Sequence, residues 1–212
     1  MKTVSLAPIK IIRIENISSS NNANENRTEL DSHANTCVFG KDTALITQDF
    51  DQPVKVLGYD GAIGEKESCR TVTAVVAYDH PATGEVFYLH FHQAILIPRM
   101  TNNLISPMQL RENDLYVNDE PKHMVLTPTD NHHAICAPHW RFPEDDEPFW
   151  IPLMLHGITS YFPTRKPTIS EYENSDMDHC IDMTSADMSW DPMASHFGEQ
   201  EEQMLDRKGN LR

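Results

Sequence analysis

Residues 30–37 read Leu-Asp-Ser-His-Ala-Asn-Thr-Cys and are the most informative part of this 212-residue chain. An acid, Asp31, stands directly before a hydroxyl, Ser32, and small and amide residues follow. Residues 18–24 consist of Ser, Asn and Ala alone, a composition too polar and small for a core and typical of a linker. An acid and a hydroxyl placed after such a linker indicate acid/base chemistry at Asp31.

Peptide hydrolysis by carboxylates needs two of them a few ångströms apart, sharing one proton, so that one activates water while the other protonates the scissile carbonyl. The chain offers one such Asp-Ser copy, so the pair must form across the two-fold axis of a homodimer. Residues 30–36 resemble the Leu-Asp-Thr/Ser-Gly-Ala-Asp loop of retroviral-type aspartic proteases. His33 stands where that family has Gly, and Asn35 where many members have Asp.

A second resemblance lies about sixty residues downstream, in residues 93–110, which read Gln-Ala-Ile-Leu-Ile-Pro-Arg-Met-Thr-Asn-Asn-Leu-Ile-Ser-Pro-Met-Gln-Leu. This segment is similar to the Asn-Val-Leu-Tyr-Val-Pro and Asn-Leu-Leu-Ser-Val-Ser-Gln-Leu motifs that close the protease domain of copia-type retrotransposon polyproteins. The resemblance covers residues 27–127 and continues less distinctly to about residue 173. It implies an all-β, retropepsin-like closed sheet with one short helix, formed as a symmetric homodimer, with flexible tails.

The same resemblance implies an aspartic endopeptidase that cleaves its own polyprotein and needs no metal or organic cofactor. Asp31 would activate water, and the Ser32 hydroxyl would bond across the dimer axis. Glycines at 58, 61 and 64 would form a flap over the substrate, although a bland surface hairpin explains them equally well. The implied substrate-binding residues are His33, Ala34, Asn35, Gly58, Tyr59 and Gly61.

The difference from the resembling loop that matters for the chemistry is His33. Histidine adds bulk beside the aspartates and a side chain that titrates near neutrality. A protonated imidazole would favour two ionised carboxylates, which cannot supply the acid half of the mechanism. The alternative is an imidazole that points away and packs under the loop.

Local patterns place several elements. Residues 71–78 and 85–92 predict a hairpin, because residues 79–84 between them contain the turn formers Pro and Gly. Ser106 followed by Pro107 and Gln109 predicts one short helix over residues 107–113. Residues 37–40, 44–47 and 54–57 favour short strands, and residues 133–137 and 149–155 a further hairpin.

We therefore expect four regions: an N-terminal strand and disordered linker (1–26), the protease-like domain (27–127), a C-terminal β extension (128–170), and an acidic, largely disordered tail (171–212). The tail holds eleven acidic residues against three basic ones, about half of the net charge of −15. Its Met and Trp content leaves open a short docking helix near residues 197–207.

Bulk composition narrows the function classes. The negative net charge argues against a nucleic-acid binder. The four cysteines, Cys37, Cys69, Cys136 and Cys180, show no Cys-x-x-Cys pair, so a disulfide framework or zinc ribbon is not indicated, and we expect a reduced intracellular, cytoplasmic setting. No stretch approaches the roughly eighteen apolar residues of a membrane span.

Two other function classes stay open. A catalytically inactive or domesticated module of the same fold would dimerise or bind without hydrolysis and would be indifferent to Asp31→Asn. A metal-dependent hydrolase would use the histidines: His90 and His92 alternate onto one strand face, and His132 and His133 lie near a neighbouring strand. The sequence names no third ligand, and packing or solvent-facing histidines explain the same residues.

Overall fold

The structure, a computed structural model, describes residues 26–56, 66–137, 148–206 and 208–212. Across these residues strands dominate, and the longest α-helix has nine residues. The predicted all-β class is therefore confirmed. In the same part of the chain no helix has the length and apolar character needed to cross a membrane.

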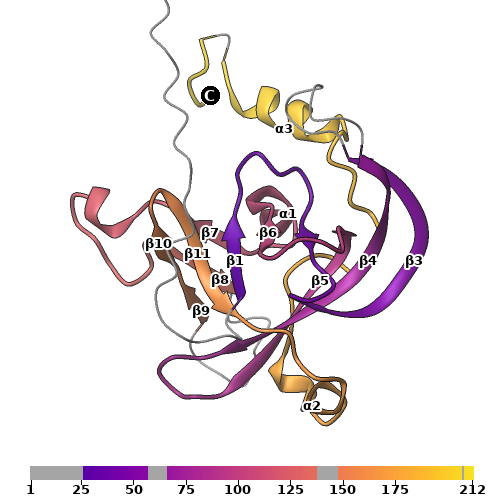
Figure 1. Ribbon diagram of the computed structural model, residues 1–212. Coiled ribbons are helices and arrows are strands. Elements are labelled where there is room, and N and C mark those ends of the chain that lie inside the picture. Colours follow the sequence, from indigo (N-terminus) through magenta and orange to yellow (C-terminus); the bar gives the residue numbers. More distant parts are fainter. Residues whose placement is uncertain (1–25, 57–65, 138–147, 207) are drawn as a thin grey trace, which may run out of the picture.

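The main sheet has nine strands in the order β10-β11-β1-β6-β2-β5-β4-β3, and β12 adds to β5 outside this path. Figure 1 shows the long strands β3 and β4 curving around one side of the molecule. The strands are β1 (Asn26–Leu30), β2 (Val38–Phe39), β3 (Leu45–Val56), β4 (Lys66–Asp79), β5 (Val86–Leu96), β6 (Asn103–Ile105), β10 (Met154–His156), β11 (Thr159–Thr164) and β12 (Cys180–Asp182).

The main sheet curls back on itself. Beyond β11, Arg165 pairs with Ala77 of β4 through two backbone hydrogen bonds of 2.8 and 3.0 Å. Strands β11, β1, β6, β2, β5 and β4 therefore form a ring that closes at this bridge. Closure removes sheet edges that would otherwise carry unpaired backbone groups.

Three further strands form a small second sheet in the order β7-β8-β9. They are β7 (Tyr116–Asn118), β8 (Ala134–Ala137) and β9 (Phe149–Pro152). Ile135 pairs with Ile151 between β8 and β9, which confirms the predicted second hairpin. Residues 1–25, which hold the expected N-terminal strand and linker, lie outside the described residues. The acidic loop at residues 144–147 also lies outside them.

The predicted central hairpin is present as β4 and β5, which pair from Arg70↔Leu96 to Asp79↔Val86. Its turn is closed by backbone bonds from Gly84 N to His80 O and from His80 N to Glu85 O, both 2.8 Å. Gly84 has a φ of 74°, a conformation that glycine adopts without strain. The two strands expected at residues 44–47 and 54–57 are instead one strand, β3, with irregular register against β4.

Helix α1 (Pro107–Arg111) begins where the sequence predicts it. The Ser106 side chain accepts a hydrogen bond from Gln109 N, and Pro107 occupies the first turn. Two further α-helices follow: α2 (Ile169–Glu173), which was not expected, and α3 (His196–Met204), which lies where the sequence left open a short helix near residues 197–207; 3-10 turns lie at Lys122–Met124 and Met177–His179. Thr168 and Glu171 start α2 with a reciprocal capping box, which favours a helix even on a charged segment.

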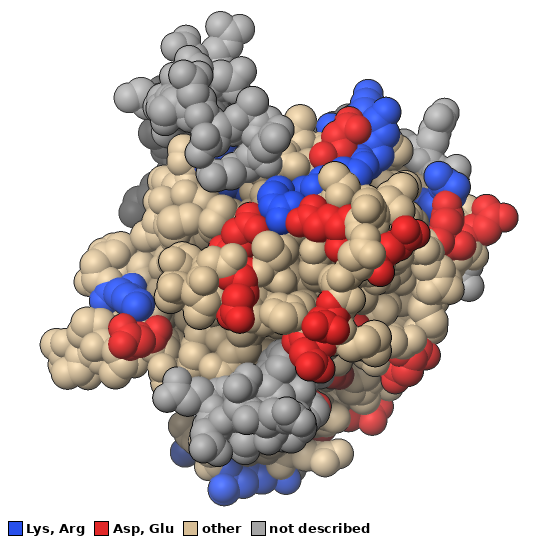
Figure 2. All heavy atoms as spheres, turned by 90° about the horizontal axis from the view of Figure 1, so that it is seen from below, with Lys and Arg blue, Asp and Glu red and all other residues tan. Residues whose placement is uncertain are grey.

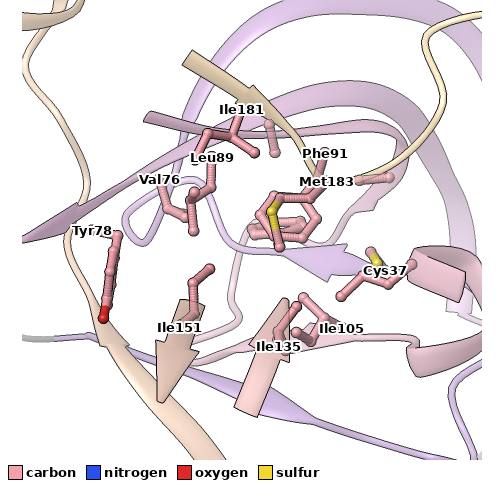
Figure 3. Close-up of a cluster of buried hydrophobic side chains, with 14 of the residues drawn as sticks. Cys37, Val76, Tyr78, Leu89, Phe91, Ile105, Ile135, Ile151, Ile181 and Met183 are labelled. Carbon is pink, nitrogen blue, oxygen red and sulfur yellow. The ribbon is translucent and has the colours of Figure 1, made fainter. Parts of the chain in front are cut away.

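One hydrophobic core unites the chain from Cys37 to Met183. Figure 3 shows Leu89 and Phe91 of β5 facing Ile135 and Ile151 of the small sheet, with Met183 beside them. Fully burying one such side chain contributes about 1.5–3 kcal/mol. Residues beyond 127 therefore complete the core of the domain rather than extend it.

Residues 171–212 were expected to form a largely disordered tail, but residues 180–183 are part of the fold. Strand β12 pairs in parallel with β5, and Ile181 and Met183 are 2% and 0% exposed. The prediction counted acidic residues over the whole of residues 171–212, and this count gave no weight to two apolar residues at alternating positions. Each of them lies within the core that β5 helps to build.

Candidate active site

The loop that carries Asp31 has its position fixed by the strand order. Strand β1 pairs in parallel with one side of β6 (Leu30↔Ile105), and β2 pairs antiparallel with the other (Val38↔Leu104). Residues 31–37 must therefore pass over the C-terminal end of β6. Asp31 N donates to Ile105 O at 3.0 Å, which anchors the residue to that strand end.

The C-terminal end of the loop, at Cys37, is held by helix α1 and its N-cap residue. Cys37 N donates to Gln109 Oε1 at 2.9 Å, and Ser106 N donates to Cys37 Sγ at 3.3 Å. Burial raises the pKa of the Cys37 thiol to about 12, so the group stays protonated and serves packing rather than nucleophilic chemistry. The Gln109 amide, which was expected to cap its own helix, instead fixes the loop.

The Asp31 side chain is 37% exposed and bonded within its own loop. Oδ1 accepts the His33 N–H at 2.9 Å, and Ala34 N donates to Asp31 O at 3.1 Å. A carboxylate bonded two residues ahead makes an Asx turn, which orders the loop whether or not the acid is catalytic. The carboxylate keeps access to solvent, as an acid or base acting on a bound substrate requires.

His33 lies beside the carboxylate and does not pack under the loop. Its side chain is 84% exposed, with Nδ1 3.8 Å from Asp31 Oδ1 and 3.5 Å from Ser32 Oγ. The sequence left both orientations open, and the structure gives the one that places the imidazole in solvent beside Asp31.

The remaining predicted site residues divide into two groups. Ser32 and Asn35 are exposed and Ala34 is half-buried, all within a few residues of Asp31 on the same loop. Gly58, Tyr59 and Gly61, the predicted flap, lie outside the described residues. The structure thus brings together Asp31, Ser32 and His33.

A cavity of about 740 Å³ lies away from this loop. It is lined by α1, β7 and β8, among them Arg111, Tyr116 and Ala134, together with Trp150 of β9. No loop residue from 31 to 36 lines it. This cavity therefore is not a peptide cleft over Asp31.

Sequence reasoning missed Trp190 as a neighbour of the loop. Its indole Nε1–H donates to Thr36 Oγ1 at 3.1 Å, and its backbone N–H donates to Gln93 Oε1 at 2.9 Å. This residue was expected to lie in a largely disordered acidic tail. No short-range signal links positions 36 and 190, so only the fold reveals the contact.

The four histidines that the sequence suggested as metal ligands do not lie in one cluster. His132 bonds the Thr129 side chain at 2.7 Å, and His133 bonds Ser160 Oγ at 3.0 Å, so neither joins the β5 pair. His90 and His92 do share one face of β5, next to Asp182 of β12. Burial lowers the pKa of His90, with the Asp182 carboxylate opposing that shift.

Surface charge is spread out. The face shown in Figure 2 carries acidic side chains scattered among uncharged ones, with basic side chains in separate places. A large mixed cluster joins Arg165 to Asp79 and Glu171. On the face in view, the basic groups form no continuous stripe along which a phosphate backbone would bind.

Comparisons of the chain with protein-family models, with curated proteins and with solved structures found no match.

Proposed function

We propose that the chain is an aspartic endopeptidase of a copia-type retrotransposon polyprotein. Two copies would each contribute Asp31 to a pair of carboxylates that activates water against a peptide bond. The carrying observation is that the motif loop is anchored at a strand end, by Asp31 N on Ile105 O, while the Asp31 carboxylate stays accessible. This is the placement that a symmetric pair of loops requires.

The mechanism uses the two carboxylates in different protonation states. One Asp31, ionised, accepts a proton from water as the water attacks the scissile carbonyl carbon. The other, protonated, donates to the carbonyl oxygen, and the resulting diol collapses with loss of the amine. Two carboxylates a few ångströms apart share one proton because both cannot easily ionise.

A homodimer is part of the proposal, because one chain carries one motif loop. The Ser32 side chain is exposed and its hydroxyl can bond across the two-fold axis, which would hold the two loops rigid. Ala34 and Asn35 would line the substrate cleft, with the Asn35 amide bonding a peptide backbone. His33 would border that cleft, and Gly58, Tyr59 and Gly61 would fold over the other side.

A second candidate is a module of the same fold that binds or dimerises without hydrolysis. The observation that favours it is the His33 imidazole 3.8 Å from the Asp31 carboxylate. Two such imidazoles at a dimer axis, when protonated, would stabilise the doubly ionised pair and remove the acid. This candidate keeps the dimer and loses the cleavage.

The test is a tagged chain, with different tags at its two ends, followed for tag release between about pH 4 and 8. Asp31→Asn removes the proposed acid/base, and Asp42→Asn is the matched control, an exposed Asp that also precedes a hydroxyl residue, Thr43. The proposal predicts that Asp31→Asn alone lowers cleavage, by about 10²-fold or more, and that a transition-state-mimicking aspartic protease inhibitor blocks it. Folded dimers that release no tag, and cut no member of a peptide library, would favour the second candidate.

A further inference from the structure

Strand β5 presents two imidazoles on one face. Residues two apart on a strand point the same way, so His90 and His92 share a face while Leu89 and Phe91 fill the core on the other. Strand β12 lies alongside in parallel register, with Asp182 opposite His90. The pairing places the Asp182 carboxylate on the same face as both rings.

The three side chains meet at ligating atoms. His92 Nε2 is 2.8 Å and His90 Nδ1 is 3.7 Å from Asp182 Oδ1, and all three atoms lie within 4.8 Å of one another. A tetrahedral zinc ion with bonds of about 2.0–2.1 Å places its ligand atoms about 3.3 Å apart. These atoms would have to move to that spacing when the ion binds, and a pair at the 4.8 Å limit would have to close by about 1.5 Å.

The other nitrogen of each ring has a partner of its own. Tyr172 OH lies 3.3 Å from His90 Nε2, and Thr73 Oγ1 lies 3.3 Å from His92 Nδ1. Without an ion, His92 Nε2 donates to Asp182 Oδ1 at 2.8 Å. When an ion binds, the hydroxyls could accept a proton from the other ring nitrogens, which would leave His90 Nδ1 and His92 Nε2 with lone pairs for the metal. Metal-binding histidines are oriented in this way by a hydrogen bond at the second nitrogen.

A β-bulge contributes to this arrangement. The register of β4 and β5 shifts between Val72 and Ala74, so His92 and Gln93 together stand opposite Thr73. Gln93 adopts a φ of 54°, and bulges commonly re-aim a neighbouring side chain. Here the irregularity lies where the Thr73 hydroxyl meets the His92 ring.

Burial and access also fit an ion. The two histidine side chains are each 15% exposed, whereas Asp182 is 53% exposed, so the cluster is enclosed on the imidazole side and open on the carboxylate side. Water can fill a fourth position there. Two imidazoles and one carboxylate suit Zn²⁺ better than Ca²⁺ or Mg²⁺, which prefer oxygen ligands.

We propose that His90, His92 and Asp182 bind one Zn²⁺ ion, which fastens β12 to β5. Strand β12 is three residues long, and Met183 N beside it donates to His90 O at 2.8 Å. An ion at this point joins the C-terminal segment to the centre of the main sheet. The proposal is independent of the proteolytic activity, since the cluster shares no residue with the Asp31 loop.

The test measures Zn²⁺ binding to the full chain, prepared without a polyhistidine tag and freed of metal with a chelator. Competition with a chromophoric chelator gives affinity and stoichiometry, and Co²⁺ in place of Zn²⁺ gives a visible spectrum that reports tetrahedral N/O ligation. We expect one ion per chain. Asp182→Asn and His92→Gln should weaken binding at least tenfold, and Thr73→Val about tenfold through lost orientation of the ring.

The matched control is His156→Gln, an exposed histidine at the end of β10, which should bind as the wild type does. Asp182→Asn keeps an acceptor for His92, so cooperative thermal unfolding of this variant shows that the fold is retained. Zn²⁺ should then raise the Tm of the wild type and leave that of Asp182→Asn unchanged. A wild type without saturable binding, or a folded Asp182→Asn with wild-type affinity, would overturn the proposal and leave a metal-free His–Asp ion pair.

Discussion

The indole N–H of Trp190 donates a hydrogen bond of 3.1 Å to Thr36 Oγ1, joining the C-terminal segment to the loop that carries Asp31. Figure 1 shows α3, which follows Trp190, on the same side of the molecule as the connection between β1 and β2. Phe197 of α3 lies against the indole, with ring centroids 5.9 Å apart. The order of the loop thus depends in part on a residue 154 positions away.

Trp190→Phe keeps an aromatic ring and removes the N–H donor. We expect the free energy of unfolding to fall by about 0.5–1.5 kcal/mol, and amide hydrogen exchange in residues 31–37 to speed up. Thr36→Val, which removes the acceptor, closes a double-mutant cycle measured by urea unfolding. Additive effects of the two substitutions would show that the bond does not couple them.

His33→Gly removes the imidazole beside Asp31 and restores the residue of the resembling loop. In a catalytic dimer we expect faster cleavage, with the larger gain at acidic pH, because there the protonated ring opposes the protonated carboxyl. The pH profile of peptide cleavage for the two proteins measures this. An unchanged profile would mean that His33 does not act on the carboxylate pair.

Glu171 links pH to stability through Arg165. The guanidinium donates to Glu171 Oε2 at 2.9 Å, and this hydrogen bond lowers the pKa of the carboxyl below its usual value. A lowered folded-state pKa gives stability that is fully present above the unfolded pKa of about 4.3 and is lost as pH falls through the folded pKa. The stability that the Glu171–Arg165 ion pair contributes is therefore lost only at acidic pH.

Glu171→Gln keeps the capping box at Thr168 and removes this ionisation. Measured as Tm between about pH 2 and 7, the difference between wild type and variant should be constant above pH 4.5 and shrink at lower pH. Glu173→Gln, an exposed change in the same helix, is the control. A difference that does not shrink in acid would contradict the assigned ion pair.

Thiol reactivity reports the burial of the loop end. Because burial raises the pKa of Cys37 to about 12, the native thiol carries almost no thiolate at pH 8. Iodoacetamide should label the partly exposed Cys180 first and Cys37 only as fast as the protein unfolds, as peptide mass spectrometry can measure. Equal native rates at the two cysteines would show that the loop opens locally.

Short-range features of the fold were predictable from sequence. The β4–β5 hairpin follows from strand-forming residues on either side of Pro81 and Gly84, and α1 from Ser106 and Pro107. In each case the deciding residues are neighbours in the chain. Local conformational preference was therefore sufficient to locate them.

Long-range features were not predictable in the same way. The position of β6 between β1 and β2, which places Asp31, depends on pairings across more than sixty residues. Asp182 joined His90 only because Ile181 and Met183 carry β12 into the core. A charge count over residues 171–212 could not separate these two apolar residues from the solvated majority.

Mixed dimers test whether each proposed active site needs Asp31 from two chains. Wild type and Asp31→Asn are unfolded together in equal amounts, refolded so that the copies pair at random, and assayed for peptide cleavage at constant total protein. If the Asp31 pair forms between two chains, we expect about one quarter of the wild-type rate, because only dimers with two intact copies are active. A rate of about one half would contradict it, because each chain would then act alone.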